Sequence, residues 1–278
     1  MTKSISQPIR YTGIQPQYFP RLHYFSRIIQ TDIFALRDDA QFVRKHKYPD
    51  GRTDKSYQAD TPIKQAYGSQ LLSIPLQHQE KTFSPIKDTG ISYTIDWVER
   101  HLKTIQLAYA NSPYFSVIFP EVETLLTSKY SDLASLDVAT IMWALLRVIG
   151  ITNITPSMLS IPTVLTFLRK QQNIRLQKIV CASESETMKD LTLKTNEKIV
   201  GLILEYGATE DYCGGTGVSA YVDHDLFRKR GITINVQNWK CKEYPQQFTK
   251  QQGFMPNLSI LDLLFHVPSP LARDILIG

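Results

Sequence analysis

The sequence of 278 residues lacks the features that mark several common classes of protein. Its three cysteines, Cys181, Cys213 and Cys241, are odd in number and far apart, so they predict neither a disulfide framework nor a zinc site. No run of about 18 apolar residues predicts a membrane span. The polar residues near the amino terminus, among them Lys3 and Gln7, do not resemble a signal peptide. We therefore expect a cytoplasmic protein with reduced cysteines and no membrane span.

The chain also lacks a dense block of one charge. Its formal net charge of +5 is spread along the sequence, so nucleic acid is not an expected partner. A mildly basic protein is compatible with a small anionic substrate, such as a phosphate ester. The composition, 42% hydrophobic and 21% charged, is that of an ordinary globular protein, and no internal repeat is apparent. The length fits one large domain or two small ones and leaves the oligomeric state open.

The stretch from residue 13 to residue 42 predicts a strand, a turn, a helix and a second strand. The turn is QPQYFP at residues 15–20, where two prolines exclude a regular helix. Apolar residues then recur at the spacing of one helical face, at Leu22, Phe25, Ile28 and Ile29. The run IFAL at residues 33–36 has the length and composition of a buried strand.

Polar side chains follow both predicted strands. In open α/β sheets, ligands bind in the crevice outside the carboxyl ends of the strands. We expect Gln15 and Tyr18, after the first strand, to bind substrate there. Asp38 and Asp39, after the second strand, are candidate catalytic residues. The alternative is that the acids end a strand in solvent while the aromatic residues fill the core. Two adjacent acids alone do not predict a Mg²⁺ site, and we predict no metal ligands.

A histidine lies on the apolar face of a helix that is predicted to begin after residue 96. Asp96 is the expected N-cap, with Glu99 completing a variant of the capping box. Trp97 and His101 share one face with apolar residues at steps of four. His101 is either a general base, because imidazole titrates near neutral pH, or a hydrogen-bonded residue of the core.

A glycine-rich loop follows Tyr212. Residues 213–217, CGGTG, lack the lysine of a Walker loop and the spacing of a dinucleotide fingerprint. The loop from Gly214 to Gly217 is a candidate anion-binding nest, and a tight turn is the alternative. Further on, a final helix is predicted, with Ser259 or Asn257 as its cap and an acid in its first turn, Asp262.

Strands alternate with helices along most of the chain. Helices are predicted at residues 115–126, 133–149 and 197–206, and strands at residues 71–76, 91–95, 151–154 and 232–236. Residues 44–70 are expected to form a long loop or an irregular hairpin, and Pro162 to break any helix near residues 157–167. The alternation favours an α/β fold with a largely parallel, Rossmann-like sheet and a more helical middle at about residues 96–206.

Residues near both ends and in the middle of the chain match the pattern of one known family. They are residues 14–20, Tyr24, Phe25, Asp32 and 38–42; His101, Ile105, Tyr109 and 113–115; and Tyr212, Gly214, Gly217, Tyr221, Asp223, 244–246 and 254–265. In order and spacing they resemble the WbqC-like protein family over nearly the whole length. Two segments depart from the pattern: residues 44–70 are longer and differently composed, and residues 171–196 look like an insertion.

The resemblance implies a single WbqC-like domain over residues 1–278 and a role in bacterial surface polysaccharide biosynthesis, of the O-antigen or lipopolysaccharide type. Because such polysaccharides include acylated amino sugars, it implies acyl or aminoacyl transfer that forms an amide on an amino-sugar nucleotide. In this hypothesis His101, Asp38 or Asp39 deprotonates the amine. The predicted substrate-binding residues, which would position sugar hydroxyls and a phosphate, are Gln15, Tyr18, Gly214, Gly217, Tyr221, Gln246 and Ser259.

Two other functions fit the sequence. One is nucleotidyl transfer, because the early strand, turn and helix resemble the entry of nucleotidyltransferase-type Rossmann folds. In this chain, however, Gln15 and Pro16 stand where that group has histidines. The other is a noncatalytic glycan-binding or assembly protein whose aromatic side chains stack on sugar rings. Cys213 is a further candidate, as the carrier of a thioester, although family members tend to have serine there. The donor, the acceptor and any cofactor are left open.

Overall fold

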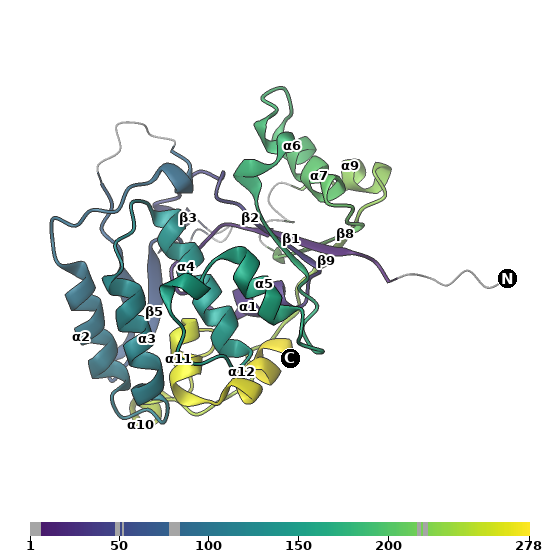
Figure 1. Cartoon of the computed structure of the whole chain (residues 1–278). Coiled ribbons are helices and arrows are strands. Elements are labelled where there is room, and N and C mark those ends of the chain that lie inside the picture. The colour runs from purple at the N-terminus through teal and green to yellow at the C-terminus, as the bar shows by residue number, and fades with distance from the viewer. Residues whose placement is uncertain (1–6, 48–50, 52, 78–83, 216–217, 219–221) are drawn as a thin grey trace.

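The computed structural model describes residues 7–47, 51, 53–77, 84–215, 218 and 222–278. Its centre is a parallel sheet of five strands in the order β7-β2-β1-β8-β9, with helices on both faces (Figure 1). The strands are β1 (Arg10–Ile14), β2 (Ile33–Leu36), β7 (Lys178–Cys181), β8 (Glu210–Cys213) and β9 (Thr233–Val236). The predicted α/β class with a parallel, Rossmann-like sheet is confirmed.

The strand order reverses between β1 and β8. From β1 the chain moves outward through β2 to β7, then returns to β8 and continues outward to β9. β1 pairs with β2 along four residues, whereas its pairing with β8 is limited to two, Arg10 with Glu210 and Tyr11 with Asp211. The carboxyl-terminal parts of β1 and β8 are therefore not paired with each other. In doubly wound sheets ligands bind at this position, which we term the switch point.

Alternate residues of each strand build the two faces of the sheet. On one face, Phe34 and Leu36 pack into the larger core with α1 (Leu22–Ile29), α4 (Leu133–Val148), α5 (Ile161–Leu168) and α12 (Ser269–Ile277). On the other face, Ile33 and Ala35 pack with α7 (Thr195–Glu205) and α9 (His224–Lys229). Both faces of β2 are covered, which explains why all four of its residues are apolar.

A second layer of structure covers the larger core. It contains α2 (Trp97–Tyr109), α3 (Phe115–Thr127) and α11 (Ile260–His266), with the hairpin of β5 (Asp60–Gln65) and β6 (Gly68–Ser73). β3 (Lys45–Lys47) and β4 (Thr53–Lys55) form another hairpin, so residues 44–70 contain regular strands rather than a long loop. The short elements are η1 (Ile86–Asp88), η2 (Pro156–Met158), η3 (Ala182–Glu184), α6 (Glu186–Lys189) and α10 (Thr249–Gln252).

Several predicted elements are confirmed. Asp96 caps α2 by accepting a hydrogen bond from the Glu99 amide at 2.9 Å, and Ser259 caps α11. α3, α4, α7 and β9 lie at their predicted positions within one or two residues. None of the helices in the described part of the chain has the length and apolar character that crossing a bilayer requires.

Three predictions about elements were wrong. Residues 91–95 and 151–154 contain no strand, because short apolar runs of this length also occur in buried connections. Pro162 does not break a helix but lies in the first turn of α5, where a missing N–H leaves no helical hydrogen bond unmade. The edge strand β7 was not predicted; it lies within residues 171–196, whose interpretation as an insertion stays a prediction. The polar strand β8 was not predicted at all.

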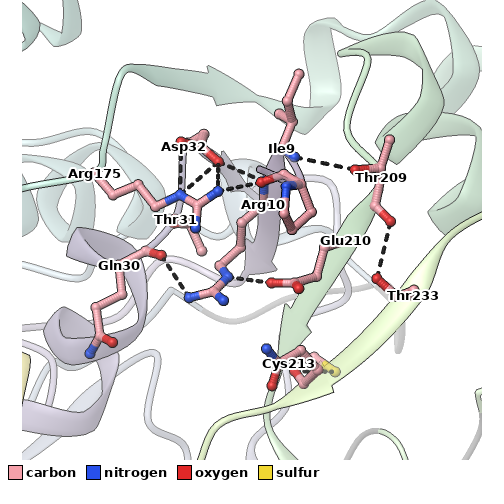
Figure 2. A network of polar contacts seen from close by, with 12 residues as sticks. Ile9, Arg10, Gln30, Thr31, Asp32, Arg175, Thr209, Glu210, Cys213 and Thr233 are labelled. Atoms are coloured by element: carbon pink, nitrogen blue, oxygen red, sulfur yellow. Dashed lines mark hydrogen bonds and ion pairs between the residues drawn. The ribbon is translucent and has the colours of Figure 1, made fainter. Parts of the chain in front are cut away.

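A polar network joins the amino ends of the strands (Figure 2). Arg10 forms an ion pair with Glu210 and donates through Nη1 to the Gln30 carbonyl at 3.2 Å. Arg175 pairs with Asp32 at 2.7 Å, and the same carboxylate accepts from the Arg10 backbone N–H at 2.6 Å. Ion pairs therefore occupy the end of the sheet where the strands begin.

Candidate functional site

The turn between β1 and α1 is held in a strained conformation beside the switch point. Phe19 has a φ of 37°, in the left-handed region that bulky residues rarely adopt. Its N–H donates to Thr140 Oγ1 at 3.1 Å. Its carbonyl accepts from Thr61 Oγ1 at 2.7 Å and from Ser259 Oγ at 3.1 Å. Three separate elements therefore fix this backbone, and strain of this kind is concentrated at functional sites.

His23, in the first turn of α1, is oriented by Asn257. The Oδ1 atom of Asn257 accepts hydrogen bonds from the His23 backbone N–H and from ring Nδ1, each at 3.0 Å. Because a carbonyl oxygen only accepts, Nδ1 carries the proton and Nε2 keeps its lone pair. Nε2 has no hydrogen-bond partner among the described residues. Asn257 has a φ of 57°, a left-handed conformation that asparagine tolerates.

The environment of His23 keeps its ring neutral. Burial lowers the His23 pKa to about 4, and the positive charges of Arg27 and Arg21 lower it further, against the opposing hydrogen bond from Asn257. At neutral pH the ring is therefore uncharged, with Nε2 available to accept a proton. This is the protonation state that a general base needs.

Arg27 lies one turn after His23 on the same face of α1 and is held by Gln237. Its Nε donates to Gln237 Oε1 at 2.9 Å, and Gln237 Nε2 donates to the His23 carbonyl at 2.9 Å. The guanidinium packs against Gly214, the first residue after β8, where an added Cβ would lie 2.8 Å from Nη2. His23 and Arg27 are thus placed at the carboxyl ends of β8 and β9, beside the switch point.

Two titratable side chains of β8 lie near Arg27, the buried Asp211 and the half-buried Cys213. Burial raises the pKa of Asp211 to about 6, and the charge of Arg27 opposes this rise. Burial also raises the pKa of Cys213 to about 12, so its thiol is protonated at neutral pH and is a poor nucleophile. This environment does not favour a thioester on Cys213.

Asp38 and Asp39 lie at the carboxyl end of β2, as expected, and both carboxylates have partners. Asp38 accepts from the Ser183 N–H at 3.0 Å and from Ser183 Oγ at 2.6 Å, which joins β2 to the segment after β7. Asp39 accepts two hydrogen bonds from Arg37, at 2.8 and 3.0 Å. Within the described ranges no group of three or more His, Cys, Asp or Glu side chains is placed to hold a metal ion. A catalytic role for either acid stays a prediction.

His101 is buried in the helical layer, where both ring nitrogens are hydrogen-bonded. Nδ1 lies 3.0 Å from the Tyr18 hydroxyl, and Nε2 lies 3.2 Å from the Ser73 carbonyl. Because the carbonyl only accepts, Nε2 donates and Nδ1 accepts from Tyr18, whose side chain is fully buried. Burial lowers the His101 pKa to about 4, and Trp97 packs edge-on against its ring. This geometry favours the alternative of a hydrogen-bonded core residue over a general base.

The remaining predicted substrate residues do not form one cluster. Gln246 Oε1 accepts from Lys64 Nζ at 2.9 Å, so this side chain fixes the loop before α11. Ser259 is fully buried between its own helix and the Phe19 carbonyl. The carbonyl of Gln15 accepts from a buried tyrosine hydroxyl at 3.2 Å. These contacts are structural, and a substrate role for the three residues stays a prediction.

The loop after β8 is described in part. Gly214 packs against Arg27, so it is the member of the predicted substrate set that lies beside His23 and Arg27. Gly217 and Tyr221 lie outside the described residues.

Sequence reasoning missed His23, Arg27, Gln237 and Asn257. His23 and Arg27 are four residues apart in a helix that was recognised, so two polar positions at this spacing were the available signal. Asn257 meets His23 across 234 residues, and Gln237 meets Arg27 across 210. No local pattern predicts such contacts.

The sheet order and these side chains define a doubly wound α/β protein with an imidazole and a guanidinium at the ligand-binding edge of its sheet. The model of the WbqC-like protein family matches residues 15–272, and the chain belongs to this family. An uncharacterized protein of Mycobacterium tuberculosis, Rv1507c, is 25% identical over 256 residues, which cover 91% of this chain and 92% of that protein. No solved structure matches the chain.

Proposed function

We propose that the protein is a transferase of bacterial surface polysaccharide biosynthesis that forms an amide on an amino-sugar nucleotide by acyl or aminoacyl transfer. The observation that carries the proposal is the pairing of His23 with Asn257, which leaves a neutral imidazole with an available Nε2. The position beside the switch point supports it, because small-molecule substrates bind there in this architecture. The polysaccharide context is what the resemblance to the WbqC-like family implies, and the chain belongs to that family.

In the proposed reaction the amine nitrogen of the sugar forms a bond to the carbonyl carbon of an acyl thioester, and the carbon–sulfur bond breaks. The amine gives one proton to Nε2 of His23, and the imidazolium returns that proton to the departing sulfur. Asn257 keeps the proton on Nδ1, so Nε2 is the basic atom of the resting ring. A general base of this kind contributes a factor of about 100 to 10,000 to the rate.

Turnover by the full chain tests this proposal. Amino-sugar nucleotides and acyl thioesters are combined with the protein, and amide formation is followed by mass spectrometry. We expect His23→Gln, which keeps a polar side chain but no base, to lower turnover at least about 100-fold. His224→Gln is the matched control, because His224 is exposed on α9. Undiminished amide formation in His23→Gln would contradict the assigned base, and no amide from any pair would contradict the transferase.

Asp39 is the alternative base to be compared in the same assay. Its carboxylate is held by Arg37, the first residue after β2, so Asp39→Asn also breaks an ion pair. A large loss of turnover in Asp39→Asn at normal thermal stability, with His23→Gln active, would move the role of base to Asp39.

Nucleotidyl transfer is a second candidate, and one observation favours it. The sequence has no histidine in the turn after β1, but the fold brings His23 and Arg27 together at the switch point, where the phosphates of a nucleotide bind in related sheets. A nucleoside triphosphate incubated with a sugar phosphate would then release pyrophosphate. Pyrophosphate release without amide formation would select this reaction over acyl transfer.

A further inference from the structure

We infer that Arg27 and Arg21 bind the diphosphate of a nucleotide-activated substrate beside the switch point, with Gln237 holding Arg27 in place. The inference rests on the proposed function for the identity of the substrate, and it adds the residues that recognise the activated end. Its basis is a pair of guanidinium groups, both largely removed from solvent, that form no ion pair with a carboxylate within the described ranges. Asp54 acts on Arg21 and Asp211 acts on Arg27 only at longer range.

Four other buried or half-buried arginines are matched by acids, whereas the half-buried Arg273 on α12 donates to Gln171 Oε1 at 3.4 Å and has no acid partner among the described residues. The ion pairs are Arg10 with Glu210, Arg37 with Asp39, Arg147 with Glu121, and Arg175 with Asp32. Removing a cation from water costs free energy unless an opposite charge or hydrogen-bond acceptors replace the water. Two guanidinium groups that lie together at the ligand edge without a contacting carboxylate therefore favour an anion as the ligand of this part of the structure.

Arg27 is oriented without being neutralised. Gln237 accepts from Nε through an uncharged amide at 2.9 Å, so this contact orients the guanidinium without neutralising its charge. The two Nη groups have no hydrogen-bond partner among the described residues and present the paired donors that suit a phosphate. Gly214 allows the guanidinium to lie against the backbone after β8, because an alanine Cβ would come within 2.8 Å of Nη2 and 3.3 Å of Nη1.

Arg21 supplies the second positive charge, at the N-cap of α1. Its guanidinium lies over the ring of Tyr57, 5.2 Å from the ring centre, and its buried Nε has no hydrogen-bond partner in the described part of the chain. Arg21 and Arg27 both act electrostatically on His23, so the two charges lie near one imidazole. A single phosphate matches one guanidinium, whereas a diphosphate matches both, and the helix N-terminus adds to the attraction.

Anion binding at these arginines also changes the pKa of His23. Arg27 and Arg21 lower the His23 pKa, so a bound diphosphate that offsets their charges raises it toward its ordinary value. The imidazole then accepts the proton of the amine more readily. The activated substrate thus strengthens the base that acts on it.

Calorimetric titration of the full chain with UDP, inorganic pyrophosphate and inorganic phosphate, at one fixed salt concentration, tests the assignment. We expect UDP and pyrophosphate to bind and phosphate to bind at least 10-fold more weakly. Arg27→Ala should weaken UDP binding at least 10-fold. Arg100→Ala, which removes an exposed arginine from α2, should leave binding within twofold.

Gly214→Ala gives a second test that removes neither a charge nor a hydrogen bond. Its Cβ displaces the flexible end of Arg27 rather than backbone, so the fold should persist, while UDP binding weakens at least 5-fold. Gly215→Ala is the matched control, because the contact that its Cβ would make among the described residues is an ordinary one, with Val236 at 3.5 Å. UDP binding that is unchanged in both Arg27→Ala and Gly214→Ala, or equal affinity for phosphate and UDP, would overturn the inference.

The titrations test the diphosphate site and the turnover assay tests the assigned base, so one hypothesis can be contradicted while the other stands. Binding of UDP that depends on Arg27, together with normal turnover in His23→Gln, removes the proposed base and keeps the diphosphate site. Loss of turnover in His23→Gln with no UDP binding by the native chain removes the diphosphate site and keeps the base. Histidine NMR gives an independent readout, since the His23 pKa should rise when UDP is added to the native chain and not to Arg27→Ala.

Discussion

At the scale of single residues, His23 couples folding to pH. Its pKa is about 4 in the folded chain and about 6.5 in the unfolded chain. Between these values the unfolded chain binds more protons, so the free energy of unfolding falls as the pH falls from about 7 to about 4. Fully developed, this loss amounts to roughly 3 kcal/mol.

Urea unfolding from pH 4 to pH 8 measures this effect. We expect the native chain to lose more stability on acidification than His23→Gln, in which the titrating group is gone. His224→Gln, in an exposed position, should keep the native pH dependence. Parallel curves for the native chain and His23→Gln would show that the folded environment does not lower the His23 pKa.

Two residues near Arg27 have pKa values shifted in opposite directions. Burial lowers that of the His23 base to about 4 and raises that of the Asp211 acid to about 6. A carboxyl group usually has a lower pKa than an imidazole, and this order of pKa values is reversed here. Near pH 5 the imidazole is neutral while the carboxyl group holds its proton, and such separated pairs are typical of sites that carry out acid–base chemistry.

At the scale of elements, the turn between β1 and α1 depends on a hydroxyl of α4. Thr140 Oγ1 accepts from the strained Phe19 N–H and donates to the Asp137 carbonyl at 2.8 Å. We expect Thr140→Val, which keeps the shape and removes the hydroxyl, to lower the free energy of unfolding by about 1–3 kcal/mol, because the buried N–H loses its acceptor.

Chemical unfolding followed by circular dichroism measures this change. Thr124→Val on α3 is the control, since the Thr124 hydroxyl is exposed and bonds only within its own helix. A loss in Thr140→Val no larger than in Thr124→Val would mean that the turn keeps its conformation without α4.

The sequence predicted helices better than the strands that build the site. α1, α2, α4 and α11 were recognisable because apolar spacing and caps are local properties. β8, with the sequence EDYC, was not, because its buried polar residues have no strand-like pattern. The same polar residues give β8 its chemistry, so the element that was hardest to predict is one that lies at the switch point.

At the scale of the whole molecule, the fold class was predictable and the site was not. Alternating strands and helices predict a parallel sheet, but the strand order that places the switch point between β1 and β8 is a property of the complete fold. His23, Gln237 and Asn257 meet only when that order is established. The predicted candidates followed strand ends in the sequence, and several were found in structural contacts instead.

Asp262 connects α11, the helix before the carboxyl-terminal α12, to the rest of the molecule. Its fully buried carboxylate accepts from the Tyr109 hydroxyl of α2 at 3.2 Å and from the Tyr244 hydroxyl at 3.0 Å. Burial raises the Asp262 pKa, and His266 and Lys64 are among the groups that oppose the rise. From the sequence, Asp262 was expected only to be a favourably placed acid in the first turn of a helix.

We expect Asp262→Ala to lower the free energy of unfolding by about 3–5 kcal/mol, since it leaves two buried hydroxyls without their acceptor and the buried Lys64 without its counter-charge. Asp274→Ala on α12, where the carboxylate is exposed, should change it by less than about 0.5 kcal/mol.

Urea unfolding by circular dichroism and by tryptophan fluorescence measures both variants. The two signals should shift together, because α2, α11 and the β5–β6 hairpin share one core with the sheet. A fluorescence transition that separates from the loss of secondary structure would mean instead that Asp262 stabilises the helical layer alone.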